Sequence, residues 1–95
     1  MRIYVKELPH ISRDDGEHLH QIIEDHWDNE QLVLDFDGVI IASIGFLDEA
    51  IGLFALDFPL EVVKERILIE NINENDRKLL NMIVSLRVEG RNANI

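Results

Sequence analysis

The sequence has 95 residues and contains no cysteine, no threonine and only two prolines. Without cysteine, the protein can form neither a disulfide nor a thiolate metal site. No apolar run approaches the roughly 18 residues that a membrane-spanning helix needs. The N-terminal stretch MRIYVKELPH carries charges where a signal peptide requires an apolar segment. These absences predict a cytoplasmic protein that does not enter the membrane.

Basic residues are also scarce in the chain. The chain contains nine Lys and Arg and nineteen Asp and Glu, which gives a net charge of −10. Such a surface repels the phosphates of nucleic acids and favours basic partners, so direct nucleic-acid binding is not expected. Two interpretations stay open. The chain is either an ordinary acidic protein of a bacterium or phage, or an acidic mimic of nucleic acid that occupies a basic groove.

Strand and helix patterns alternate along the whole chain. They predict strands at 2–8, 31–36 and 66–70, helices at 13–27, 43–57 and about 75–86, and a further helical turn at 60–65. The order β-α-β-α-β-α implies an α/β fold with a small, mostly parallel or mixed sheet flanked by helices. We therefore predict a single domain over residues 1–95, with its core at about 2–86 and a frayed polar tail from Gly90.

Four local features sharpen this prediction. The three consecutive apolar residues at 32–34 predict a central strand buried on both faces. The expected helix N-caps are Ser12, Ser43, and Asn73 or Asn75. Asp28 and Asn29 are expected to form a turn. Gly52 lies inside the second helix, where it costs about 1 kcal/mol relative to alanine, which indicates that another element packs closely against it.

Acidic side chains mark the solvent faces of the first two predicted helices. On the first helix, Glu17, Glu24 and Asp28 fall opposite the apolar face, as a carboxylate stripe. On the second helix, Asp48 and Glu49 are expected to point outward beside Phe46. Each stripe is either a solvated face or a docking surface.

The stretch LVLDFDGV, residues 32–39, resembles the first motif of the haloacid dehalogenase phosphatases. In that family the first aspartate, here Asp35, is the nucleophile, the second, here Asp37, is the general acid or base, and Mg²⁺ joins them to a phosphate. Phosphoryl transfer also needs a cation and further groups on the metal. The chain offers no threonine, no suitably placed serine and no acidic pair after the third strand. We expect a non-enzymatic protein without catalytic residues or cofactors, and keep a minimal Mg²⁺-dependent phosphatase as an alternative.

The four histidines do not form a recognisable metal site. His18 and His20 are two residues apart on a helix and face different directions, so they cannot chelate one ion well. His26 falls on the apolar face of the first helix, where a partly buried side chain is expected. No metal site is predicted.

Read from end to end, the chain resembles the STAS-like domain family of unknown function. The resemblance covers residues 2–86 and is carried by four motifs in order. These are Ser12-Arg13-Asp14-Asp15-Gly16 with Leu19, the segment Leu34-Asp35-Phe36-Asp37-Gly38-Val39, then Ser43 with Phe46, Leu47, Asp48 and Glu49, and finally Ile67, Ile69 and Asn71 through Leu80.

The resemblance implies a regulatory function through protein partners. The wider STAS fold includes the anti-sigma factor antagonists, which bind kinase-like ATPases and are switched by phosphorylation of a serine at the start of a helix. Here the acceptor position holds Gly45, and Ser43 lies two residues earlier, so Ser43 is a possible phosphoacceptor. The expected partner-binding residues are Ser43, Phe46, Asp48, Glu49, Glu17, Glu24 and Asp28. The expected partner is a kinase-like ATPase. The alternative is an inhibitor of a basic nucleic-acid-binding complex, of the anti-CRISPR or anti-nuclease type, and a homodimer stays open.

Overall fold

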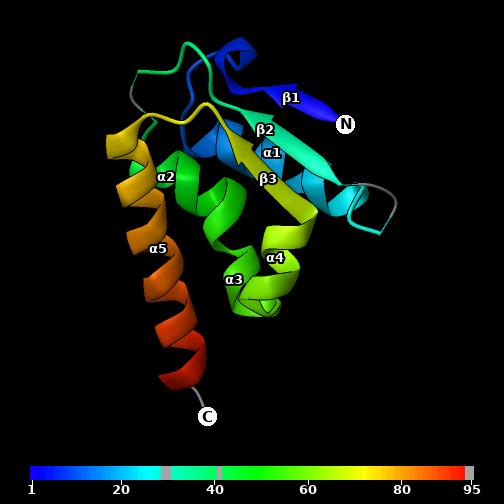
Figure 1. Ribbon diagram of the computed structural model, residues 1–95, viewed down its shortest axis with the longest axis vertical. Coiled ribbons are helices and arrows are strands. Elements are labelled where there is room, and N and C mark those ends of the chain that lie inside the picture. Colours follow the sequence, from blue (N-terminus) through cyan, green and yellow to red (C-terminus); the bar gives the residue numbers. More distant parts are fainter. Residues whose placement is uncertain (29–30, 41, 94–95) are drawn as a thin grey trace.

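The chain folds into a three-stranded sheet packed against helices (Figure 1). The computed structural model describes residues 1–28, 31–40 and 42–93. In chain order the elements are β1 (Arg2–Tyr4), the 3-10 turn η1 (Val5–Glu7), α1 (Arg13–Asp25), β2 (Leu32–Asp35), α2 (Ile44–Leu47), the π-helical segment η2 (Asp48–Gly52), α3 (Phe54–Asp57), α4 (Leu60–Arg66), β3 (Ile67–Glu70) and α5 (Glu74–Ala93). The predicted α/β fold class is confirmed. The predicted turn residue Asn29 lies outside the described residues.

All three strands run parallel, in the order β1-β2-β3. The register aligns Tyr4 of β1 with Asp35 of β2, and Asp35 with Glu70 of β3. The C-terminal ends of the strands therefore meet at one edge of the sheet. β2 is the central strand, as its apolar sequence predicted, and β1 and β3 are edge strands.

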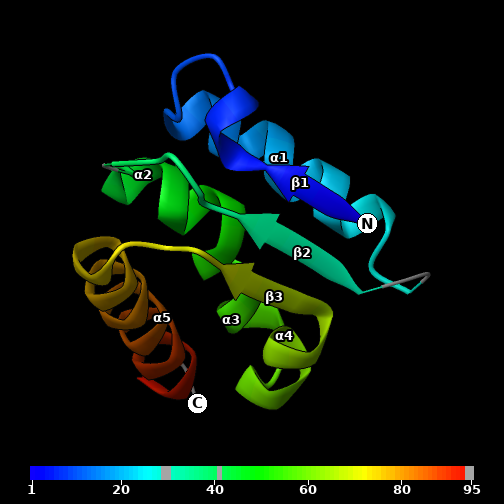
Figure 2. The same cartoon turned by 45° about the horizontal axis from the view of Figure 1, so that its top comes forward.

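The helices cover one face of this sheet and leave the other open. Leu32 and Leu34 of β2 are buried, whereas Val33 between them is only partly buried and Leu68 of β3 is 37% exposed. Figure 2 shows α1 and α3 behind the strands. The prediction that residues 32–34 are buried on both faces is therefore wrong. Consecutive apolar residues cannot reveal which face of a strand the helices will cover.

The core lies between the sheet and the helices. Its largest fully buried side chains are Val5, Leu19, Ile23, Leu32, Leu34, Phe36, Phe46 and Leu47. Burial of each such aliphatic or aromatic side chain contributes roughly 1.5–3 kcal/mol relative to exposure, so these residues are the main source of stability.

Close contact between the second helical segment and α5 explains Gly52. A Cβ atom added at Gly52 would lie 2.8 Å from Cγ2 of Ile83 in α5 and 2.7 Å from Oδ1 of Asp48. The predicted close packing at this glycine is confirmed. An ion pair holds the same two elements together, because Arg87 Nε of α5 donates to Asp48 Oδ1 at 2.8 Å.

The ends of two elements differ from the sequence prediction. β1 stops at Tyr4 because residues 5–7 form the turn η1, which brings Val5 into the core with no exposed surface. α5 continues through Gly90 to Ala93, beyond the helix end expected at about residue 86, and the fraying expected from Gly90 stays a prediction. One glycine costs a helix only about 1 kcal/mol, which does not suffice to end it. Among the described residues, no helix is both long and apolar enough to cross a membrane.

Candidate functional site

Asp35, the first aspartate of the phosphatase-like motif, ends β2 and accepts hydrogen bonds on both oxygens. Oδ1 accepts from Asn71 Nδ2 at 3.0 Å and from the N–H of Asp37 at 2.9 Å, and Oδ2 accepts from Arg2 Nη1 at 2.8 Å. The same Arg2 atom lies 2.9 Å from Glu70 Oε1, so one guanidinium joins all three strands. These contacts, led by the Asn71 amide and then the Asp37 N–H, hold the pKa of Asp35 below its ordinary value.

This arrangement gives Asp35 a structural role at the edge of the sheet. Its side chain is only 6% exposed, whereas Asp37 is exposed. Asn71 adopts a positive φ of 58°, which asparagine tolerates better than most residues, and so reaches back to Asp35. Within the described ranges, no group of three or more His, Asp or Glu side chains is arranged to hold a metal ion.

Ser43 lies at the start of α2 and makes two hydrogen bonds. Its Oγ accepts from the N–H of Phe46 at 3.0 Å, which confirms the predicted N-cap, and donates to the carbonyl of Ile11 at 3.2 Å. Ile11 has a positive φ of 47°, a conformation in which a β-branched residue is strained. Strain of this kind costs on the order of 1–3 kcal/mol and concentrates at functional sites. Ser43 therefore connects an exposed helix start to a strained loop before α1.

Two large aliphatic side chains are exposed on either side of Ser43. Ile40, in the segment between β2 and α2, is 84% exposed, and Ile44, the first residue of α2, is 56% exposed. We call Ile40, Ser43 and Ile44 the loop surface. Neighbouring exposed apolar side chains at a loop are typical of sites where another protein binds.

A buried hydrogen-bond network anchors the loop surface to the start of α5. Asn73 Oδ1 accepts from the N–H of Asp76 at 2.9 Å and so caps α5, while Asn73 Nδ2 donates to the carbonyls of Ile40 at 2.9 Å and Val39 at 3.3 Å. The Asp76 carboxylate, 4% exposed, accepts from Asn73 Nδ2 at 2.7 Å and from the N–H of Ala42 at 2.9 Å. We call Asn73 and Asp76 the loop anchor. It fixes the conformation in which the isoleucines are exposed.

Three predicted partner-binding residues of the second helix lie inside the molecule. Phe46 is fully buried in the core. Asp48 pairs with Arg87 and is 13% exposed at its side chain, and Glu49 pairs with Arg13 at 2.7 Å and is 19% exposed. The expectation that Asp48 and Glu49 point to solvent is wrong, because α1 and α5 both pack against this segment. Helical spacing in the sequence indicates which residues share a face, but not which other elements pack against that face.

The acidic stripe of α1 lies on the surface, and part of it borders a hollow. Glu17, Glu24 and Asp28 are all exposed. Glu24 and Asp28 line a hollow of about 410 Å³ together with Asp57 and the aromatic residues His20, Trp27, Phe54 and Phe58. The rings are stacked, with the centroid of Phe54 4.1 Å from that of His20 and 4.7 Å from that of Trp27. Aromatic rings beside carboxylates are suited to hold a cationic side chain.

Sequence reasoning missed the exposed isoleucines and the second role of the loop anchor. Asn73 was identified as a cap, and neither Ile40 nor Ile44 was predicted to bind a partner. A signal existed for Ile44, which falls beside the apolar face that Phe46 and Leu47 define, whereas Ile40 precedes the predicted helix. The contacts of Val39, Ile40 and Ala42 with Asn73 and Asp76 span more than 30 positions and leave no local pattern.

Comparison with known proteins identifies the family. A family model described as a STAS-like domain of unknown function (DUF4325) matches residues 15–77, about two thirds of the chain. No curated protein and no solved structure matches the chain. The matched range contains Asp35 with its contacts to Asp37 and Asn71 and the whole loop surface, and its last residues include the loop anchor; Arg2 lies outside it. The chain belongs to this family of STAS-like domains.

Proposed function

We propose that this protein is a non-enzymatic regulatory domain that binds a partner protein through the loop surface Ile40, Ser43 and Ile44. The observation that carries the proposal is the exposure of two isoleucines, 84% and 56%, beside backbone groups that are held by hydrogen bonds to Asn73 and Asp76. A free loop would lose conformational entropy on binding. A segment fixed in advance avoids much of that cost, so more of the apolar burial contributes to affinity.

The non-enzymatic character is inferred from Asp35. A nucleophile must be free to attack, whereas both oxygens of Asp35 already accept hydrogen bonds and one faces Arg2. The minimal phosphatase remains testable. Hydrolysis of p-nitrophenyl phosphate with Mg²⁺, lost on Asp35→Asn in a variant that stays folded, would contradict this part of the proposal.

The proposed partner is a kinase-like ATPase, following the wider STAS fold. Phosphorylation of Ser43 would give such a partner a means of control. A phosphate there would remove the O–H that donates to Ile11 and would add negative charge close to Arg13. A Cβ added at Gly45 would lie 3.3 Å from Arg13 Nε, so this guanidinium lies over the start of α2. A phosphate would compete with Glu49 for Arg13.

The test is capture of the partner by the intact protein in cells, with crosslinking and mass spectrometry. We expect recovery of a kinase-like ATPase with the wild type and at least a tenfold loss with Ile40→Ser combined with Ile44→Ser. The matched control is Leu86→Ser on α5, a leucine that is 58% exposed and outside the loop surface. Recovery of no such ATPase, or equal recovery with the double variant, would refute the proposal.

The hollow beside α1 supports a second candidate function, inhibition of a basic nucleic-acid-binding protein. An arginine or lysine of the partner would enter between the aromatic rings and the carboxylates of Glu24 and Asp28. Trp27 is the only tryptophan and reports binding directly. A hexa-arginine peptide should change its fluorescence, and Glu24→Lys with Asp28→Lys should abolish the change. Glu17→Lys, on the same helix but outside the hollow, should retain much more of it.

A further inference from the structure

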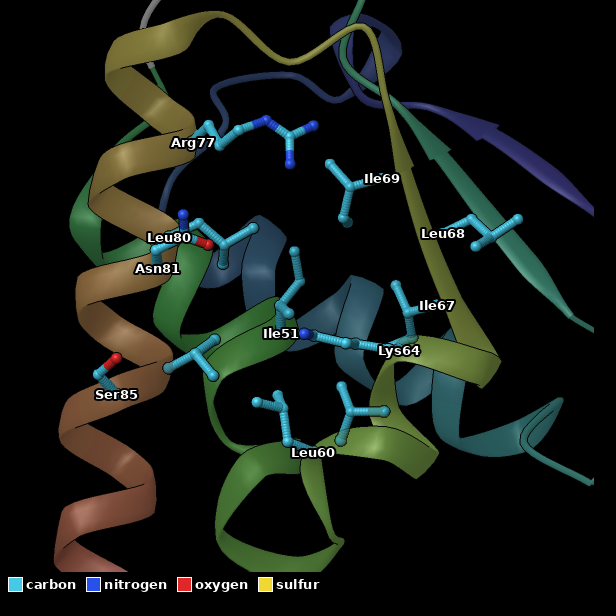
Figure 3. Close-up of a pocket in the computed structure, with 12 residues that line it drawn as sticks. Ile51, Leu60, Lys64, Ile67, Leu68, Ile69, Arg77, Leu80, Asn81 and Ser85 are labelled. Atoms are coloured by element: carbon cyan, nitrogen blue, oxygen red, sulfur yellow. The ribbon is translucent and has the colours of Figure 1, made fainter.

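A groove between β3 and α5 lies outside both surfaces described above. Its volume is about 460 Å³, and its lining comes from α4, β3 and α5 together with Ile51 of η2 (Figure 3). Leu60, Ile67, Leu80 and Val84 contribute to an apolar floor. A cavity of this size and character lies within the range that binds ligands or peptide side chains.

The groove borders the free edge of the sheet. β3 pairs only with β2 within the described sheet, and the carbonyl of Glu70 accepts from the N–H of Phe36 at 2.9 Å. Successive residues of a strand direct their peptide groups to opposite sides, so Ile69 directs its N–H and C=O away from β2. An edge strand with such outward groups is a template for pairing with another chain.

The charge of the groove is opposite to that of the rest of the molecule. Its lining includes Lys64 and Arg77 and no carboxylate, although the chain has nineteen Asp and Glu against nine Lys and Arg. Figure 3 shows the Lys64 side chain directed toward Ile51 and the Arg77 guanidinium directed toward Ile69. Neither cation forms an ion pair with a carboxylate of the residues described. These two cations give the lining of the groove a net positive charge, and at physiological salt charges beyond about 8 Å are largely screened.

From these three observations we propose that β3 accepts an extended acidic peptide segment of a partner as an added strand. The backbone of the segment pairs with the outward groups of Ile69. Alternate apolar side chains enter the groove, and carboxylates between them or at the segment's end bind Lys64 and Arg77. This surface shares no residue with the loop surface, so it does not depend on the function proposed above.

The probe is an acetylated and amidated octapeptide of alternating valine and glutamate, titrated into the ¹⁵N-labelled full chain and followed by NMR. We expect shifts at residues 67–71 and at 77–85 of α5, with a Kd below about 1 mM. A peptide with lysine in place of glutamate should bind at least tenfold more weakly. No binding at that concentration, equal binding of both peptides, or shifts elsewhere would overturn the proposal.

Variants separate the charge and backbone contributions. Lys64→Glu combined with Arg77→Glu should reverse the preference, so that the lysine peptide binds more tightly than the glutamate peptide; loss of structure alone cannot produce this reversal. Lys78→Glu is the matched control, because Lys78 is adjacent to Arg77, 73% exposed and outside the groove. Ile69→Pro removes an outward donor that folding does not need and should abolish binding in a folded protein. A dimer in light scattering that Arg77→Glu dissociates would instead identify a second copy as the occupant.

Discussion

Removal of the Asp76 carboxylate tests the loop anchor most directly. In Asp76→Ala, the N–H of Ala42 loses its acceptor at a position where Ala42 is only 1% exposed, and Asn73 loses one of its partners. A buried donor left without a partner costs about 1–3 kcal/mol. Loss of a carboxylate from the first turn of α5 adds about 0.3–1 kcal/mol. The expected decrease in the free energy of unfolding is therefore about 1–4 kcal/mol, a substantial part of the roughly 5–15 kcal/mol typical of a domain.

Urea denaturation measures this decrease, with an unchanged dependence on denaturant if only the native state is affected. The melting temperature should fall by roughly 5–30 °C for a chain of this size. Asp76→Asn is the matched control. Its amide oxygen can accept from both donors, so it should lose only about 1 kcal/mol, mainly from the helix dipole. If Asp76→Ala lowered the free energy of unfolding by less than about 1 kcal/mol, or if Asp76→Asn lowered it as much as Asp76→Ala, the loop anchor would not hold the loop as described.

Two further predictions concern acid stability and close packing. Because the folded-state pKa of Asp35 is lowered, its carboxylate stabilises the fold above the unfolded value near pH 4, and this contribution is lost as the pH falls through the folded pKa. Urea denaturation between pH 5 and 2 should show that the free energy of unfolding falls less steeply with pH for Asp35→Asn than for the wild type. It should still fall in the variant, because the pKa of Asp15 is lowered too. Equal pH dependence in the two proteins would count against the Asp35 contacts. Gly52→Ala should lower the free energy of unfolding by about 1–2 kcal/mol, since overpacking against Ile83 outweighs the gain in helix propensity. Gly90→Ala, with open space around it, should be neutral or stabilising, and a stabilised Gly52→Ala would refute the packing argument.

The central position of β2, the helix caps and the close contact at Gly52 were predictable because each has a local signature. A buried strand needs a run of apolar residues, and a helix start needs a side-chain acceptor such as Ser43 or Asn73. The acidic stripe of α1 was also predictable, since a helix repeats every 3.6 residues and its period selects a face.

Much of the candidate site was not predictable in this way. Phe46, Asp48 and Glu49 carry the pattern of a helix with one solvent face, yet α1 and α5 cover both sides of that segment. The contacts that bury them join positions more than 30 residues apart along the chain. Helical periodicity describes one helix at a time and does not indicate which other elements pack against it.

The sequence by itself determined the alternation of strands and helices and the charge of −10, and it left a mostly parallel or a mixed sheet open. These follow from local conformational preference and from composition. Only the tertiary structure decided which side chains reach solvent. It buried Phe46, exposed Ile40 and Ile44, engaged Asp35 with Arg2 and Asn71, and left the edge of β3 open beside two cations. Exposure depends on how separate elements pack together, and that is a property of the folded chain as a whole.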